Sequence, residues 1–151
     1  FHFTMGFVLE LQNSKSRSIK YKSYKGSANA PWVSRNMIVS GIVILLFLGL
    51  HFYDFWFPEM NYKYVEVMPL NPDRYFEEMI HKFESPVRVG IYVFSFLFLA
   101  LHLYHGFASS FQSMGLNNKY SKAIKSITAA FAIVVPVGFA VIALFHHLTA
   151  F

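Results

Sequence analysis

Three long apolar stretches limit the possible folds of this chain more than any other feature of its sequence. They lie at about residues 37–57, 87–111 and 124–148 and contain few charged side chains. A helix of roughly 20 apolar residues crosses a bilayer core of about 30 Å. Only 14% of the residues are charged, whereas soluble domains carry about 25%. The sequence therefore predicts an all-α polytopic transmembrane helix bundle.

The predicted organisation is a single membrane domain that covers the whole chain. A short amphipathic helix is expected at 73–82, after the turn signal Asn71-Pro72. The chain opens at Phe1 inside an apolar segment, so we expect the natural protein to have further helical sequence before it. The expected segments are the end of a helix at 1–12, a cytoplasmic loop at 13–36, a span at 37–57, an outer loop at 58–86, a span at 87–113, a cytoplasmic loop at 114–123 and a span at 124–148.

The charged residues predict the orientation of the spans. Residues 13–36 hold six basic side chains and no acidic one, and residues 114–126 hold three lysines and no acid. Residues 53–88, in contrast, carry seven acids against four bases. Because cytoplasmic loops are enriched in Lys and Arg, the two basic loops are expected inside and the acidic segment outside. The net charge of +5 is then a matter of loop topology, and no nucleic-acid partner is expected.

A repeated histidine signature is the main indication of function. His2 is followed by Gly6, and His102 is followed by Gly106, with Phe and Gln at matching later offsets. Residues i and i+4 lie on one face of a helix, so each imidazole has a residue without a side chain one turn away. The charge pattern places both histidines in the cytoplasmic half of the membrane. The pattern predicts a haem held between two imidazoles, with the iron as the only metal and the glycines as packing positions.

His51 lies in the outer half of its span and is predicted to ligate a second haem. It has no glycine at i+4, and no partner histidine for it is evident in the chain. Ionisable groups inside a span are costly and are usually functional, but bonding of these histidines to backbone carbonyls or waters stays an open alternative. The absence of cysteine excludes thiolate-held clusters within this chain. No catalytic residue is predicted.

Haem propionates need cations or hydroxyl groups near the membrane surface, and several polar residues are available on the cytoplasmic side. Each of them is equally well explained as an ordinary interfacial anchor. His146 and His147 are expected to reach the outer interface, and His81 is expected in solvent. The propionate candidates are Ser34, Arg35, Asn36, His105 and Lys119.

Three segments together carry a resemblance to a known family. They are His2-Phe-Thr-Met-Gly-Phe-Val-Leu-Glu-Leu-Gln-Asn13, Trp32-Val-Ser-Arg-Asn-Met37 leading to Leu50-His51-Phe-Tyr-Asp-Phe-Trp56, and His102-Leu-Tyr-His-Gly-Phe-Ala-Ser-Ser-Phe-Gln-Ser-Met-Gly-Leu-Asn-Asn-Lys119. These strings resemble the dihaem cytochrome b membrane anchor of succinate dehydrogenase/fumarate reductase (complex II). The resemblance covers essentially the whole chain.

The resemblance implies a five-helix anchor with two haems b, of which this chain would lack the first helix and most of the second. His2 and His102 would hold the inner haem, and His51 would hold the outer haem with a histidine of the missing first helix. The implied partners are an iron–sulfur subunit and a flavoprotein on the cytoplasmic side. Electrons would pass to a quinone, commonly menaquinone, in a bacterial cytoplasmic membrane. The succinate site would lie on another subunit.

One position departs from the family pattern. Some members that act as fumarate reductases have a glutamate two residues before the fourth-helix ligand, where this chain has Ala100, which mildly favours the succinate-oxidising direction. Asp54 and Trp56 are the candidate quinone contacts. Two alternatives stay open: the anchor of another respiratory complex, such as a hydrogenase or formate dehydrogenase, and a haem-free transport or assembly subunit.

Overall fold

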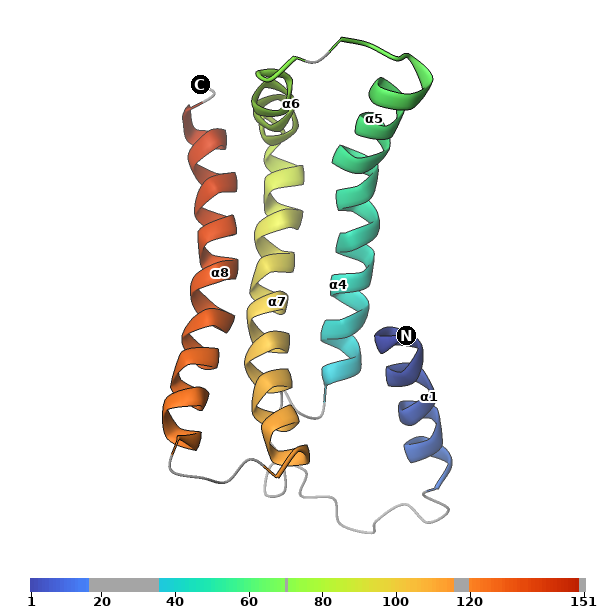
Figure 1. Cartoon of the computed structure of the whole chain (residues 1–151), viewed down its shortest axis with the longest axis vertical. Helices are drawn as coiled ribbons and strands as arrows, with labels where there is room; N and C mark the ends of the chain where they lie inside the picture. Colours follow the sequence, from blue (N-terminus) through green and yellow to red (C-terminus); the bar gives the residue numbers. More distant parts are fainter. Residues whose placement is uncertain (17–35, 70, 116–119, 150–151) are drawn as a thin grey trace.

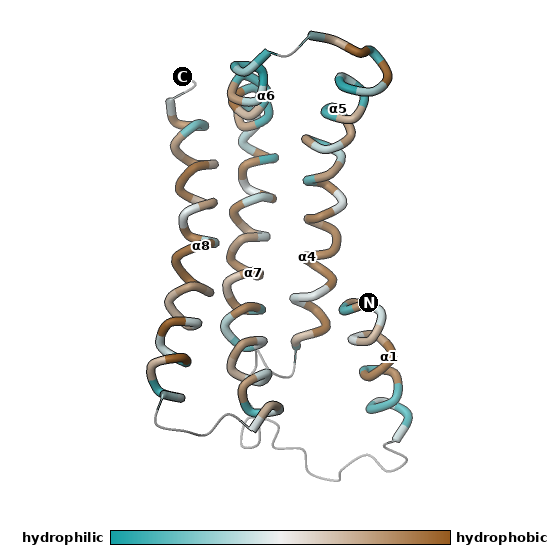
Figure 2. Tube along the Cα trace, viewed as in Figure 1, coloured by the Kyte–Doolittle hydropathy of each residue, from teal (hydrophilic) through white to brown (hydrophobic). Residues whose placement is uncertain are grey.

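The computed structural model describes residues 1–16, 36–69, 71–115 and 120–149, and these residues form helices and no strand (Figure 1). The predicted all-α class is therefore confirmed. Three helical segments are long and apolar enough to cross a membrane: Met37–Val65, Pro86–Ser113 and Ser121–Thr149. Figure 2 shows that their middle parts are hydrophobic and that polar residues gather toward their ends. In order, the elements are α1 (His2–Lys15), α4 (Met37–His51), η1 (Phe52–Trp56), α5 (Phe57–Met60), η2 (Asn61–Val65), α6 (Arg74–Phe83), α7 (Pro86–Ser113) and α8 (Ser121–Thr149).

The first span continues beyond the end that the sequence predicts. The sequence predicts an end near Phe57. The next residue, Pro58, lacks an N–H, and in an α-helix its ring clashes with the carbonyl four residues earlier. Instead, the helix runs on through α5 to Val65, with π-helical turns on either side of α5. The wider π turn relieves that clash, and π turns inside helices are frequent at functional sites. Pro136 likewise lies inside α8 without interrupting it.

Local sequence sets both ends of α7. The Ser85 hydroxyl accepts a hydrogen bond from the Arg88 N–H at 3.4 Å, and Pro86 occupies the first turn, where its missing N–H costs nothing. After Ser113 the chain leaves the helix through Gly115, whose φ of +64° is easy only for glycine. These signals set the residues at which α7 begins and ends, and therefore the place of His102 along the helix.

The helices pack in a row, with α7 between α8 and α4 (Figure 1). The short helix α1 lies against α4, and α6 lies across the ends of α7 and α8. Tyr92 of α7 lies at the centre of the buried core, where its ring meets those of Phe47, Phe83 and Phe96 edge-on at 5.1–6.0 Å. Aromatic pairs favour this edge-to-face geometry. The core therefore joins α4, α6 and α7 in the half of the bundle nearest α6.

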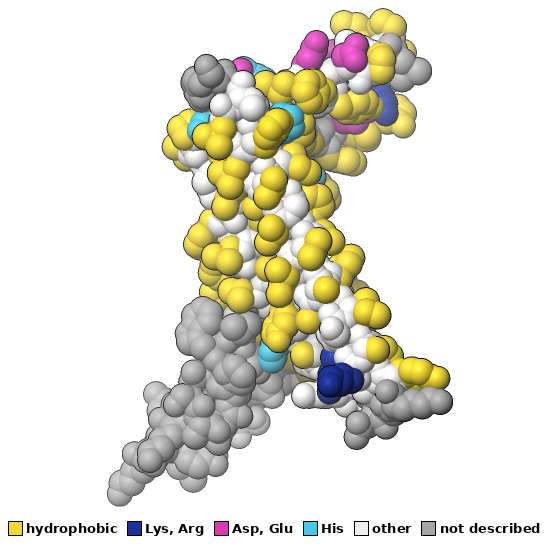
Figure 3. Space-filling model, turned by 90° about the vertical axis from the view of Figure 1, so that its left-hand side faces the viewer, with side chains coloured by type: hydrophobic (Ala, Val, Ile, Leu, Met, Phe, Trp, Pro, Cys, Tyr) yellow, Lys and Arg dark blue, Asp and Glu magenta, His cyan; other side chains and the backbone are white. Residues whose placement is uncertain are grey.

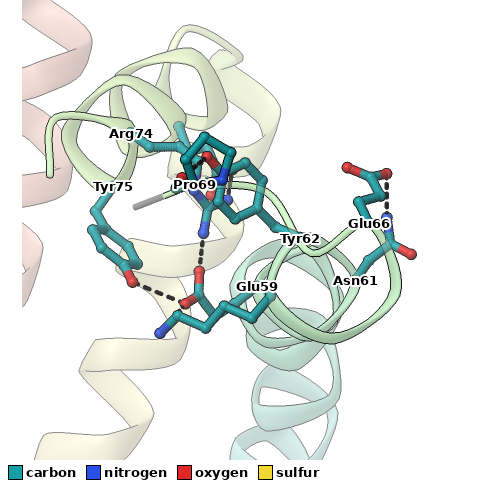
Figure 4. A network of polar contacts seen from close by, with 9 residues as sticks. Glu59, Asn61, Tyr62, Glu66, Pro69, Arg74 and Tyr75 are labelled. Carbon is teal, nitrogen blue, oxygen red and sulfur yellow. Dashed lines mark hydrogen bonds and ion pairs between the residues drawn. The ribbon is translucent and has the colours of Figure 1, made fainter. Parts of the chain in front are cut away.

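A polar network fastens α6 to the end of the first span (Figure 4). Glu59 accepts a hydrogen bond from the Tyr75 hydroxyl at 2.8 Å and forms an ion pair with Arg74. The Arg74 guanidinium also lies over the Tyr62 ring, 4.0 Å from its centroid. The His147 ring donates to the Phe83 carbonyl at 2.8 Å, which joins the end of α8 to α6. These contacts hold α6 as a cap over the bundle.

The two ends of the molecule differ in charge. Lys15, Lys122 and Lys125 lie at the end where α1 and α7 finish and α8 begins, which we term the basic end. Figure 3 shows apolar side chains over the middle of the face it presents, with acidic side chains confined to the opposite extremity. This acidic end holds Glu59, Glu66, Asp73, Glu77, Glu78 and Glu84. The acidic end also holds four basic residues, Lys63, Arg74, Lys82 and Arg88, and Glu10 lies on α1. Among the described residues the acidic side chains therefore gather mainly at one end, whereas basic side chains lie at both ends.

Candidate cofactor site between α1, α4 and α7

A cavity of about 400 Å³ lies between α1 and α4, with His102 of α7 on its wall. His2, Gly6 and Phe7 of α1 also line it, as do Gly41 and a series of aliphatic side chains of α4. Cofactor pockets are commonly of about this size, mostly apolar, and supplied with a few converging polar groups. Here the polar lining residues are the two histidines together with Glu10 and Asn13 of α1.

The His2 and His102 rings face one another across an interhelical gap. Their centroids are 6.3 Å apart and their planes stand at 89°. Metal–nitrogen bonds of about 2 Å, together with the distance from each nitrogen to its ring centre, put two imidazoles on one metal at a centroid separation of roughly 6 Å. The observed separation of 6.3 Å is close to that value, so the spacing of the two rings is compatible with one metal held between them.

Ser40 is a member of the site that the sequence argument missed. Its side chain is 5% exposed, and its Oγ lies 2.9 Å from Nδ1 of His102. At the neighbouring Gly41 the ring lies against α4: a Cβ built there would be 3.7 Å from Cε1 of His102, an ordinary van der Waals contact. The available signal was a lone hydroxyl residue in an apolar span, since such residues bond across membrane helices.

The two glycines of the repeated signature do not occupy equivalent places. Gly6 lines the cavity, and a Cβ added there would meet nothing within 4 Å. Gly106 is also open, but it is not among the lining residues. On the α4 side the cavity is lined by Gly41, which the repeat does not include. A helical repeat alone does not indicate which face each copy turns toward its neighbour.

The propionate candidates are only partly placed. Ser34, Arg35 and Lys119 lie outside the described residues. Asn36 caps the start of α4, at the basic end of the bundle. His105 is half-buried on α7 and does not line the cavity. The structure therefore sets His105 apart from the His2–His102 pair.

His51 occupies a separate region of α4, closer to the acidic end. Its exposed imidazole stacks on Phe47 at 5.8 Å and lies 6.3 Å from the Tyr92 ring. Within the described ranges no second histidine ring contacts it, and no group of three or more His, Cys, Asp or Glu side chains is arranged to hold a bare metal ion. A haem partner for His51 would have to approach this exposed face from another helix.

The two quinone candidates, Asp54 and Trp56, differ in burial. Asp54 is completely buried, and its Oδ2 accepts a hydrogen bond from the Tyr92 hydroxyl at 2.9 Å and pairs with Nε of Arg88 at 3.1 Å. Its Oδ1 is buried without a hydrogen-bond partner in the described structure. Trp56 is 47% exposed on the bundle surface. The sequence argument singled out Asp54 but not its partners on α7.

The other histidines have ordinary surroundings. His81 is exposed and lies 3.3 Å from Glu84, and the His146 ring packs against Phe76 at 5.5 Å. His147, which was expected at the outer interface, is half-buried near the end of α8 and is bonded to the Phe83 carbonyl.

Comparisons with protein-family models, with curated protein sequences and with solved structures find no match for this chain.

Proposed function

We propose that this chain is the haem b-carrying membrane anchor of a succinate:quinone oxidoreductase, which passes electrons between an iron–sulfur subunit and a quinone, most simply menaquinone. The observation that supports the proposal best is the pair of neighbouring imidazoles, His2 and His102, on the wall of a largely apolar cavity between α1 and the candidate membrane span that begins with α4. The sequence resemblance supplies the identity of the complex.

The residues of the cavity fit a haem by their chemistry. His2 and His102 would hold the haem, Gly6 and Gly41 would leave room for a flat ring, and the aliphatic side chains of α4 would exclude water. A bound haem supplies reversible one-electron transfer. With two imidazoles as its protein ligands, such a haem would carry electrons rather than bind oxygen, and its potential would depend on burial and hydrogen bonding.

The acidic end provides the residues for the remaining steps of the proposal. His51 would hold a second haem together with a histidine from a helix outside the described residues. Asp54 and Trp56 are the proposed quinone contacts: Trp56 faces the surface from which a lipid-soluble quinone arrives, and Asp54 offers a buried carboxylate with one unpaired oxygen. Arg88, at the start of α7, forms an ion pair with that carboxylate, and its own side chain is partly exposed.

The proposed assembly places the basic end in the cytoplasm of a bacterial cell, because cytoplasmic loops are rich in Lys and Arg. The iron–sulfur subunit would dock at that end, nearest to His2 and His102, with the flavoprotein subunit beyond it. No group on this chain is proposed to bind succinate.

A reduced-minus-oxidised absorption spectrum of the purified membrane protein, followed by identification of the proteins that co-purify with it, tests the proposal. We expect the α-band of haem b and the co-purification of a flavoprotein and an iron–sulfur subunit. A spectrum without an α-band would contradict the haem assignment and favour a transport or assembly role. An α-band together with hydrogenase or formate dehydrogenase subunits would contradict the assignment to succinate oxidation.

A further inference from the structure

Ser40 makes two hydrogen bonds whose directions are linked. Its Oγ lies 2.9 Å from the Met37 carbonyl oxygen, one turn back in the same helix, and 2.9 Å from Nδ1 of His102 on α7. It is the only buried residue of α4, so within the bundle the hydroxyl depends on these two partners. The contact with His102 also joins two helices that carry the candidate site.

Counting protons gives the direction of each bond. A hydroxyl has one hydrogen and two acceptor lone pairs, whereas a carbonyl oxygen can only accept. The Ser40 hydrogen therefore points to Met37, and the bond to His102 requires a hydrogen on Nδ1. A neutral imidazole carries one N–H, so Nε2 is left with a free lone pair.

We propose that Ser40 is a positioning residue: it holds His102 as the Nδ1–H tautomer and thereby presents the unprotonated Nε2 to the cavity and to His2. Metal-ligating histidines usually donate their other ring N–H to a neighbouring acceptor, which fixes the ring and makes the ligand more basic. The role of Nε2 as an iron ligand rests on the proposed function. The tautomer itself is a property of the chain and does not depend on haem.

The tautomer can be measured on the full chain, expressed without haem, isotopically labelled at histidine and reconstituted in lipid bilayers. Nitrogen chemical shifts, with the His102 signal assigned through His102→Ala, should show a hydrogen on Nδ1 in the wild type. Ser40→Ala should shift His102 toward the Nε2–H form. A wild-type His102 with its hydrogen on Nε2, or a tautomer unchanged by Ser40→Ala, would overturn the proposal even if the chain binds haem.

The haem-loaded protein provides the second readout. Removal of such a supporting hydrogen bond typically weakens metal binding by about 10–100-fold, so Ser40→Ala should weaken haem retention to a similar extent. It should also raise the midpoint potential of the inner haem, because a less basic imidazole stabilises the oxidised iron less. Ser40→Thr keeps the hydroxyl and should restore both properties.

Ser95→Ala is the matched control. Ser95 is 3% exposed on α7, but its hydroxyl bonds only to the Ile91 carbonyl of its own helix, at 2.8 Å. The control should leave haem retention and potential unchanged. Equal effects of Ser40→Ala and Ser95→Ala, or a failure of Ser40→Thr to rescue, would refute the role of Ser40. The absence of haem from every variant would instead refute the proposed function, and the tautomer measurement would still decide the role of Ser40.

Discussion

At the scale of single residues, the carboxylate of Asp54 needs bonding partners, because it is completely buried. A charge inside a membrane bundle is costly unless it is paired and hydrogen-bonded. Arg88 and Tyr92 supply those partners, and both bind the same oxygen. The free Oδ1 leaves the group incompletely satisfied, as is common where a polar group has a role besides packing.

Substitution of this carboxylate should therefore destabilise the bundle. Asp54→Ala leaves Arg88 and the Tyr92 hydroxyl without their partner, and the loss should be about 1–3 kcal/mol, the usual cost of an unsatisfied buried group. Tyr92→Phe removes one donor while Arg88 stays paired, so its cost should be about 1 kcal/mol. Unfolding of the reconstituted protein by graded denaturing detergent gives both values. Equal stability of Asp54→Ala and the wild type would contradict a buried ion pair.

The sequence indicated several of the important residues but not their partners. His2 and His102 could be paired because charged loops place the spans at a common depth. The sequence did not indicate Ser40, Arg88 and Tyr92, because each of them bonds to a side chain on another helix. Interhelical contacts depend on the rotation of each helix about its axis, which a hydrophobic pattern does not fix when lipid and core are equally apolar.

At the scale of helices, α1 and α4 define the cavity through glycines on their facing sides. Gly6→Leu should place a side chain in the open space beside His2 and displace a flat cofactor, while improving the helix propensity of α1. Haem content per protein should fall by at least tenfold although the variant stays folded. Absorption at the haem band, divided by protein concentration, measures this ratio.

Gly49→Leu is the matched control for Gly6→Leu. Gly49 lies on α4, has nothing within 4 Å of a built Cβ, and does not line the cavity. Haem content in this variant should equal that of the wild type. A similar loss in both variants would point to a general effect of bulk on the bundle, whereas full haem content in Gly6→Leu would place the cofactor elsewhere.

The ends of the helices show where sequence rules work and where they fail. Ser85-Pro86 and Gly115 mark the limits of α7 because capping and left-handed turns are local properties. The rule failed at Pro58, where the change to π-helical turns lets the first span continue to Val65. The change from α-helical to π-helical turns depends on packing around the turn, including the burial of Asp54 within η1. No local sequence pattern predicts it.

At the scale of the whole molecule, the excess of Lys and Arg in residues 13–36 and 114–126 predicts that the basic end lies in the cytoplasm. The sequence contains no cysteine, so single cysteines can be introduced without a background. Glu77→Cys at the acidic end and Lys125→Cys at the basic end replace exposed residues. In intact spheroplasts a membrane-impermeant maleimide should label the first, and it should label the second only after permeabilisation. The reverse pattern would contradict the predicted orientation.

The central claim is that His2 and His102 hold one haem between them. The most direct measurement is the reduced-minus-oxidised spectrum of His2→Ala and of His102→Ala. His105→Ala is the control, because His105 does not line the cavity. Both ligand variants should lose the same haem component, and His105→Ala should keep the wild-type spectrum. Loss of haem in His105→Ala with retention in His102→Ala, or an unchanged spectrum in both ligand variants, would contradict the account.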